Sequence, residues 1–483
     1  MTASSESARV GRLAKFFHFA ERGTSVSQEV RGGVVMFVTM AYIIILNPLI
    51  MGGFAADQAA TDVEGGWLPN HQLAAATALT AGLVTILMGV IANVPFGLAA
   101  GLGINSFLAF TLVQDLTWPE AMGLVVINGL IIVLLGATGL RRMIFNAVPA
   151  ALKSAISVGI GMFIAFIGFV NAGFVRSTTL PSPPLELGEG GSITSLPTIV
   201  FIIGLALMGG LVALRVKGAL LIGIVGTTII AIVLESIFKV GPSLGENPNA
   251  WNLNAPELPS AIVALPDLSL LGQVSFLGAF ERVGYLAAMM FIFTLVIMNF
   301  FDAMGTMTGL AKQAGISYEN GQFPGLRRAF IVEGIGAVAG GASSTSSNTV
   351  FVDSAAGVAE GARTGLSSIV AGILFLAAMF LTPLTQVVPL EVAAASLVVV
   401  GALMMAQIKD IDFTDFRVAL PAFLTIAVMP LTYNIANGIG VGFIAWVLVH
   451  ASSGRFKSIS PLLWIVAAMF VIFFARGPLQ ALV

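Results

Sequence analysis

The chain has no cysteine and only three histidines, His18, His71 and His450, which lie far apart in the sequence. Disulfide bonds and thiolate metal sites are therefore excluded, and a histidine-rich metal centre is not expected. There is also no P-loop, and the GLGINSF segment at 102–108 is not a dinucleotide fingerprint. The absence of a nucleophile motif, a metal cluster and a nucleotide loop argues against an enzyme.

Charge is scarce as well. Asp, Glu, Lys and Arg make up 10% of the 483 residues, whereas soluble domains contain about 25%. The net charge of -2 gives no sign of nucleic-acid binding. In contrast, 57% of the residues are hydrophobic and the mean hydropathy is +0.98. This composition predicts an all-α, polytopic membrane protein.

The apolar runs predict about fourteen transmembrane segments when each is compared with the roughly 20 residues that cross a bilayer. They fall at 29–53, 72–93, 99–115, 117–139, 150–171, 196–214, 218–239, 284–311, 325–341, 348–359, 364–384, 391–408, 414–432 and 435–451. A further apolar run at 460–475 is either a fifteenth span or a helix that lies on the membrane.

The N-terminal tail, residues 1–28, is mostly polar and is not a cleavable signal, so the first span is expected to remain. With this tail in the cytoplasm, the positive-inside rule places most Lys and Arg residues on the cytoplasmic side. The exceptions are Arg176, Lys239, Arg282 and Arg476. The asymmetry predicts a cytoplasmic N-terminus.

Three acidic residues lie inside apolar runs. Asp302 lies well inside the run that begins near Tyr285, Asp353 lies in SSTSSNTVFVDSAAGV, and Glu333 lies in AFIVEGIGAVAGG. A charge at the centre of a span costs about 2.5–3.5 kcal/mol on insertion scales, so it marks a substrate or ion pathway by default. The alternative is a carboxylate that only holds the bundle together, and for Glu333 this alternative is favoured over proton transfer. For Glu360, near a span end, a local ion pair with Arg363 is expected.

Two segments are unusual as spans, and they occupy matching places in the two halves. The third opens with a Gly-rich stretch before Asn105, and the tenth opens with GGASSTSSNTV before Asp353. In transporters built from inverted repeats, such interrupted segments form the binding site. We therefore expect two inverted repeats whose interrupted helices, the third and the tenth, meet in the middle of the membrane.

Five stretches together resemble the guanine/hypoxanthine (AzgA-like) purine permeases of the xanthine, uracil and ascorbate transporter superfamily. The stretches are EVRGGVVMFVTMAYIIILNPLIM, GLGINSFLAFTLV, NFFDAMGTMTGLAKQAG, TVFVDSAAGVAEGARTGLSSIVAGILFL and DFRVALPAFLTIAVMPLTYNIANGIGVGFI. The resemblance runs from about residue 20 to 475. It implies seven plus seven inverted spans, with a core (transport) domain at 29–139 and 284–384 and a gate domain at 150–239 and 391–451. An extracellular connection at 240–283 and a C-terminal segment at 452–483 complete this division.

The resemblance also implies that the substrate site includes Asn105, Asp302 and the acidic position of the tenth span. The family usually has Glu in this last position, whereas this chain has Asp353, one methylene shorter. The difference leaves the exact specificity open. Asn105 is alternatively a cap of the half-helix that follows it.

The chemistry of these residues suits an oxopurine, which presents N–H donors and carbonyl and ring-nitrogen acceptors around a flat apolar ring. Two carboxylates and an amide supply matching acceptors and a donor. Phe107, Phe301 and Phe351 flank them and are candidates to sandwich the base, although each is also an ordinary packing residue. Thr306 lies one turn after Asp302 on the same helix face, and either lines the site or bonds back to its own helix.

The sequence therefore predicts a secondary active transporter in the bacterial inner (plasma) membrane that imports purine nucleobases (hypoxanthine, guanine or adenine) by proton symport, without a cofactor or metal. Asp302, Asp353 and Glu333 are the candidate proton-coupling residues, because burial favours the neutral form of a carboxyl group. Sodium coupling and an anion exchanger or channel on the same fold are the alternatives, and a homodimer is left open.

Overall fold

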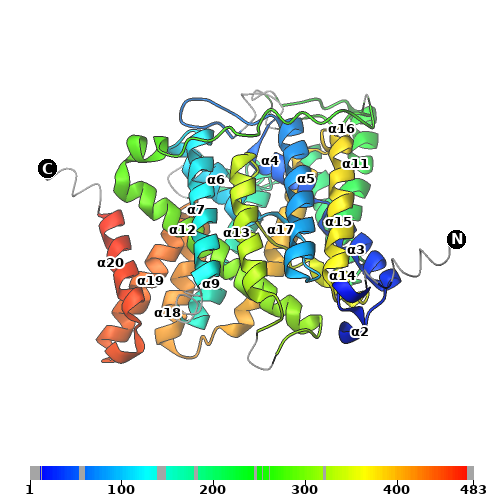
Figure 1. Cartoon of the computed structure of the whole chain (residues 1–483). Helices are drawn as coiled ribbons and strands as arrows, with labels where there is room; N and C mark the ends of the chain where they lie inside the picture. Colours follow the sequence, from blue (N-terminus) through cyan, green and yellow to red (C-terminus); the bar gives the residue numbers. More distant parts are fainter. Residues whose placement is uncertain are drawn as a thin grey trace.

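The computed structural model describes residues 11, 14–53, 60–138, 148–178, 183–243, 247, 249–252, 254–259, 261–318 and 322–475. Within these ranges the chain is mostly helical, and the long helices stand side by side in one bundle (Figure 1). The predicted N-terminal tail and C-terminal segment are described only in part, and Arg476 lies outside the described residues.

The first half of the chain contains α2 (Phe19–Arg22), α3 (Val26–Met40), α4 (Ile43–Met51), α5 (Asn70–Leu87), the π-helical turn η1 (Met88–Ala92), β1 (Leu98–Ala100), α6 (Leu102–Phe110), η2 (Leu112–Gln114), α7 (Trp118–Thr138), α9 (Ala150–Asn171), β2 (Val175–Ser177), β3 (Leu185–Leu187), α10 (Leu196–Ala213) and α11 (Ala219–Phe238).

The second half contains α12 (Gly278–Gln313), α13 (Leu326–Ala342), β4 (Asn348–Val350), α14 (Ser354–Ala359), α15 (Gly365–Ala378), η3 (Met379–Leu381), α16 (Thr382–Thr385), α17 (Leu390–Met404), η4 (Met405–Asp410), α18 (Phe416–Leu431), α19 (Ile435–Ser452), η5 (Phe456–Ser458) and α20 (Pro461–Phe474).

Ten helices within the described ranges are long and apolar enough to cross a membrane, and shorter apolar helices occur at Leu102–Gln114, Phe416–Leu431 and Pro461–Phe474. Four of the fourteen predicted spans are not among these ten: the interrupted third and tenth segments, the 17-residue α13 and the 16-residue α18. The 14-residue helix α20 is shorter than a membrane span and packs against α19 and α12. The first predicted span is divided at Ala41 and Tyr42, between α3 and α4.

The third and tenth segments meet inside the bundle, as the sequence predicts. Each begins with a short strand, and β1 pairs with β4 in antiparallel register, with Ala99 opposite Thr349. All six residues of the two strands are buried. Because backbone N–H and C=O groups have no water to bind inside the bundle, this pairing satisfies them where the helices are interrupted. The sequence did not predict these strands.

The helices pack closely in two sets. In the first, α7 packs on α13, α5 and α3 pack on α15, and α12 packs on α7. In the second, α9 packs on α17 and α18, α10 packs on α11 and α17, and α18 packs on α19. We call these the first and the second helix set. The two interrupted segments, β1–α6 and β4–α14, belong with the first set, because β1 packs on α5, β4 on α13 and α14 on α3. In addition, α6 contacts α9 of the second set.

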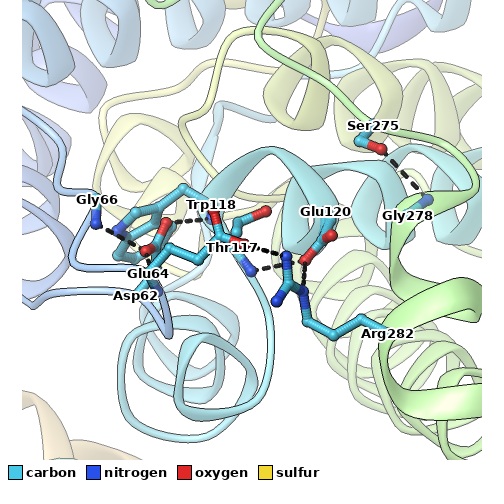
Figure 2. A network of polar contacts seen from close by, with 9 residues as sticks. All are labelled: Asp62, Glu64, Gly66, Thr117, Trp118, Glu120, Ser275, Gly278 and Arg282. Carbon is cyan, nitrogen blue, oxygen red and sulfur yellow. Dashed lines mark hydrogen bonds and ion pairs between the residues drawn. The ribbon is translucent and has the colours of Figure 1, made fainter.

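The face of the bundle that carries α2, here called the α2 face, is at the bottom of Figure 1, and the connection after α11 crosses the opposite face. A network of polar contacts joins a loop and two helix starts at this opposite face (Figure 2). Arg282 at the start of α12 bonds Glu120 of α7 at 2.7 Å and Glu64 at 2.5 Å. Asp62 accepts hydrogen bonds from the Gly66 and Trp118 backbones at 2.7 and 2.9 Å. These contacts join the loop before α5 to α7 and α12, all within the first helix set.

At the α2 face, the fully buried Glu29 of α3 caps the start of α15. Its carboxylate accepts hydrogen bonds from the backbone N–H groups of Arg363 at 2.8 Å and of Thr364 and Ser367 at 3.3 Å. The first N–H groups of a helix have no partner within the helix, and a carboxylate satisfies both them and the helix dipole. This contact sets where α15 begins relative to α3.

Candidate functional site

A cavity of about 200 Å³ lies between the two helix sets, where α6 and α14 begin. Its walls come from α6, α9, α11, α12, β4, α17 and the segment that joins β4 to α14. The residues that line it are Tyr42, Gly101, Leu102, Gly103, Ile104, Ile156, Ser157, Ile160, Leu220, Met298, Phe301, Asp302, Thr306, Thr349, Val350, Phe351, Val352, Asp353, Val400, Leu403, Met404 and Gln407.

Five of the residues singled out from the sequence line this cavity. Asp302, Phe301 and Thr306 come from α12, while Phe351 and Asp353 come from the segment that enters α14. The two carboxyl side chains are thus supplied by different elements and meet at one apolar cavity. This arrangement offers two hydrogen-bond acceptors and two aromatic rings to a flat ligand.

Asn105 and Phe107 lie on α6 but are not among the lining residues. Phe107 is fully buried and packs edge-on against Phe291, with ring centres 6.5 Å apart. Asn105 is also fully buried, and neither atom of its amide has a hydrogen-bond partner within the described ranges. The alternative that Asn105 caps α6 is wrong, because the cap position is Gly101 and Asn105 lies inside the helix. A contact of Asn105 or Phe107 with substrate stays a prediction.

Each cavity carboxyl group has one hydroxyl partner. The Tyr42 hydroxyl donates to Asp353 Oδ2 at 3.3 Å, and the Thr349 hydroxyl lies 3.4 Å from Asp302 Oδ2. The Asp353 backbone is held as well, since the Thr39 hydroxyl donates to its carbonyl oxygen at 3.2 Å. Both distances to the carboxyl groups are at the long end of hydrogen-bond geometry. The acceptors therefore remain available to a ligand.

Glycines let the start of α6 approach both helix sets. A Cβ on Gly101 would lie 2.9 Å from the Thr349 Cγ2, and one on Gly103 would lie 2.8 Å from the Ile160 Cγ2. Both distances are shorter than side chains tolerate. This explains the Gly-rich opening of the third segment, which the sequence connects with a binding site.

A second cavity, of about 300 Å³, lies toward the α2 face and shares Asp353, Leu220 and Leu403 with the first. Beside it, Glu360 at the end of α14 forms ion pairs with Arg31 of α3 at 2.9 Å and with Lys217, which precedes α11. The expected pair of Glu360 with Arg363 is wrong, because Arg363 donates to the carbonyl oxygens of Val358 and Ala362 instead. Lys217 and Glu360 thus link the second helix set to the first.

Sequence reasoning missed Tyr42, Thr349, Ser157 and Gln407, all of which line the central cavity. None of them carries a charge that would stand out in an apolar run. The hydroxyl-rich stretch before Asp353 was a signal for Thr349. Nothing in the sequence distinguishes Ser157 or Gln407 from other polar residues in the helices.

Interrupted helices that meet at a partly polar cavity inside an apolar bundle are the architecture of secondary transporters, so the fold and the cavity define a multi-pass membrane transport protein. The model of a protein family described as the Permease family, Xan_ur_permease, matches residues 27–441. The chain belongs to this family.

The relatives extend over nearly the whole chain. A guanine/hypoxanthine permease of Bacillus subtilis, PbuG, is 36% identical over 464 residues, which is 96% of this chain and 99% of that protein. The adenine permease AdeP of Escherichia coli is 33% identical over 466 residues, which is 96% of each chain. Among solved structures, the transmembrane domain of the cyanobacterial bicarbonate transporter BicA is similar, with a TM-score of 0.60 at 15% identity, over 85% of this chain and 96% of that one. At this identity the likeness to BicA shows the shared fold alone.

Proposed function

We propose that the protein is a secondary active transporter that imports purine nucleobases by proton symport. The observation that carries the proposal is the cavity in which Asp302 and Asp353 face a common space with Phe301 and Phe351. The printed names of the relatives, guanine/hypoxanthine permease and adenine permease, support a purine as the ligand. The base would place its N–H groups on the carboxylates and its ring between the aromatic side chains.

We further propose that the first helix set is the transport domain and the second is the gate domain, with the N-terminus in the cytoplasm of a bacterial cell. Transport then moves the half-helices and their cavity against α9, α11 and α17. The purine is released chemically unchanged, because the protein acts as a transporter and not as an enzyme. A homodimer stays a prediction.

The fold also occurs in the bicarbonate transporter BicA, which makes an anion exchanger the second candidate. A site for inorganic anions should present a cation. The described residues that line the cavity instead include two Asp residues, and no Lys or Arg is among them. The Lys153 ammonium group lies 5.7 Å from the centre of the Phe301 ring. Anion currents through the purified protein without purine would favour the exchanger.

Uptake of labelled hypoxanthine into proteoliposomes tests the proposal, with guanine, adenine, xanthine and uracil as competitors. Asp302→Asn keeps the shape of the side chain but removes its charge, so uptake should be nearly abolished while the protein still folds and inserts. Normal uptake by well-folded Asp302→Asn would exclude Asp302 from both substrate binding and proton coupling.

The coupling ion is tested in the same vesicles with a protonophore at constant sodium concentration. Collapse of uptake supports proton symport. Dependence on sodium together with indifference to the protonophore would replace protons by sodium.

A further inference from the structure

The Thr349 hydroxyl connects two acidic side chains that belong to different helices. Its Oγ1 lies 3.4 Å from Asp302 Oδ2 on α12 and 3.1 Å from Glu333 Oε1 on α13. Asp302 lines the central cavity, whereas Glu333 is fully buried behind it and its Oε2 has no hydrogen-bond partner in the described part of the chain. One hydroxyl thus bridges the cavity and a closed site in the protein interior.

A hydroxyl group has a single proton to donate and can accept a second hydrogen bond. It can therefore serve only one of the two carboxylates at a time. Two ionised carboxylates that share one donor would leave a buried charge without compensation, which is costly. A single additional proton removes the conflict, because the protonated acid donates to Thr349 and Thr349 donates to the remaining carboxylate.

We propose that Thr349 relays the coupled proton between Asp302 and Glu333, and that Glu333 stores it away from the substrate. When Asp302 loses its proton, the proton binds to Thr349 Oγ1, and the original hydroxyl proton of Thr349 passes to Glu333 Oε1. One O–H bond breaks at each donor and one forms at each acceptor, so no further reactant is needed.

The relay links the proton to the purine. A base N–H group needs an ionised Asp302 as its acceptor, and Asp302 becomes ionised when the proton moves to Glu333. Proton uptake and purine binding then favour the same state of the protein, as symport requires. This inference rests on the proposed function, and it adds a storage site that does not line the substrate cavity.

The surroundings of the pair fix its geometry. Thr349 is held by the pairing of β4 with β1, opposite Ala99. On the helices packed around α13, Glu120 of α7 is paired with Arg282, and on α13 itself Arg327 donates to the Ala137 carbonyl oxygen. These groups have partners elsewhere, and Asp302 is the acid that shares the Thr349 hydroxyl with Glu333.

The relay is tested by two measurements on the same reconstituted protein. Counterflow exchanges labelled for unlabelled hypoxanthine without a gradient, and accumulation uses an imposed pH gradient. The readout is the ratio of accumulation to counterflow, so a general loss of activity cancels. In Thr349→Val, which keeps the shape without the hydroxyl, and in Glu333→Gln, the ratio should fall by about 100-fold, the scale of a lost proton-transfer group. Thr349→Ser should restore the wild-type ratio.

Equal losses of accumulation and counterflow in Thr349→Val would show a purely structural role and overturn the relay. An unchanged ratio in Glu333→Gln would overturn it independently, even if Thr349→Val did not fold. Failure of the proposed function is visible in the wild type. Wild-type protein that exchanges hypoxanthine but accumulates it only with a sodium gradient overturns proton symport and the relay together, and wild-type protein that exchanges none overturns purine transport itself.

Discussion

Removal of the Glu29 carboxylate is expected to destabilise the fold strongly. Glu29 belongs to the first turn of α3 and does not line the central cavity. Glu29 is fully buried and accepts hydrogen bonds from the Arg363 N–H and the Thr24 hydroxyl at 2.8 Å. Two further N–H groups, those of Thr364 and Ser367, lie at 3.3 Å. Glu29→Ala removes the acceptor from all four donors and leaves backbone N–H groups at the start of α15 unpaired.

The magnitude follows from these distances. A hydrogen bond to a charged group contributes about 1.5–3 kcal/mol, and the two short bonds carry most of the effect. Breaking a buried charged contact by removing one partner typically costs about 3–5 kcal/mol. We therefore expect Glu29→Ala to lower the free energy of unfolding by about 3–5 kcal/mol. Glu29→Gln keeps one acceptor oxygen and should cost about 1–3 kcal/mol.

The assay is reversible unfolding of the purified protein in mixed detergent micelles, followed by tryptophan fluorescence. Glu21→Gln is the matched control, because Glu21 is exposed on the neighbouring helix α2 and its ion pair is with His18. The control should change the free energy of unfolding by less than about 0.5 kcal/mol. The reasoning fails if Glu29→Ala is as stable as the control.

The remaining predictions concern the cavity and the contact between the helix sets. The chain has no cysteine, so a short bifunctional thiol reagent can link only introduced pairs. Linking Lys217→Cys to Glu360→Cys across the two helix sets should stop purine uptake. Linking Arg31→Cys to Glu360→Cys within the first set should not. Equal inhibition by the two links would contradict movement between the sets. Tyr42→Phe removes the donor to Asp353 and should weaken the apparent affinity for purines by about two- to tenfold in competition assays. An unchanged affinity would refute this prediction. Asp353→Glu should change the rank order of competing purines and Asp353→Asn should weaken them all; if neither change occurs, Asp353 is not a substrate contact.

The candidate site was predicted in part because charge in an apolar run is a strong signal. Asp302 and Asp353 stand out as carboxyl groups where insertion into the membrane is unfavourable, and both line the central cavity. Phe301, Phe351 and Thr306 were found through their sequence proximity to these acids. Phe107 was singled out in the same way, from its proximity to Asn105 on α6, but it packs on Phe291 and does not line the cavity.

Contacts between distant segments account for most of what the sequence missed. Glu360 pairs with Arg31 and Lys217 rather than with its sequence neighbour Arg363. Thr349 acquires its position from the pairing of β4 with β1, which depends on a partner strand far away in the chain. Local spacing gives no information about such partners.

By itself, the sequence determined the class of the protein, the approximate place of its helices, the presence of two interrupted segments and the two acids that line the central cavity. These features follow from hydropathy and from the cost of burying charge, which act locally along the chain. Only the tertiary structure decided which hydroxyl groups hold Asp302 and Asp353, that Glu333 shares Thr349 with Asp302, and that Asn105 does not line the cavity. The physical reason is that a hydrogen bond forms only when the distance between donor and acceptor is right to within a few tenths of an ångström. For side chains on different helices, this distance depends on packing that no local pattern specifies.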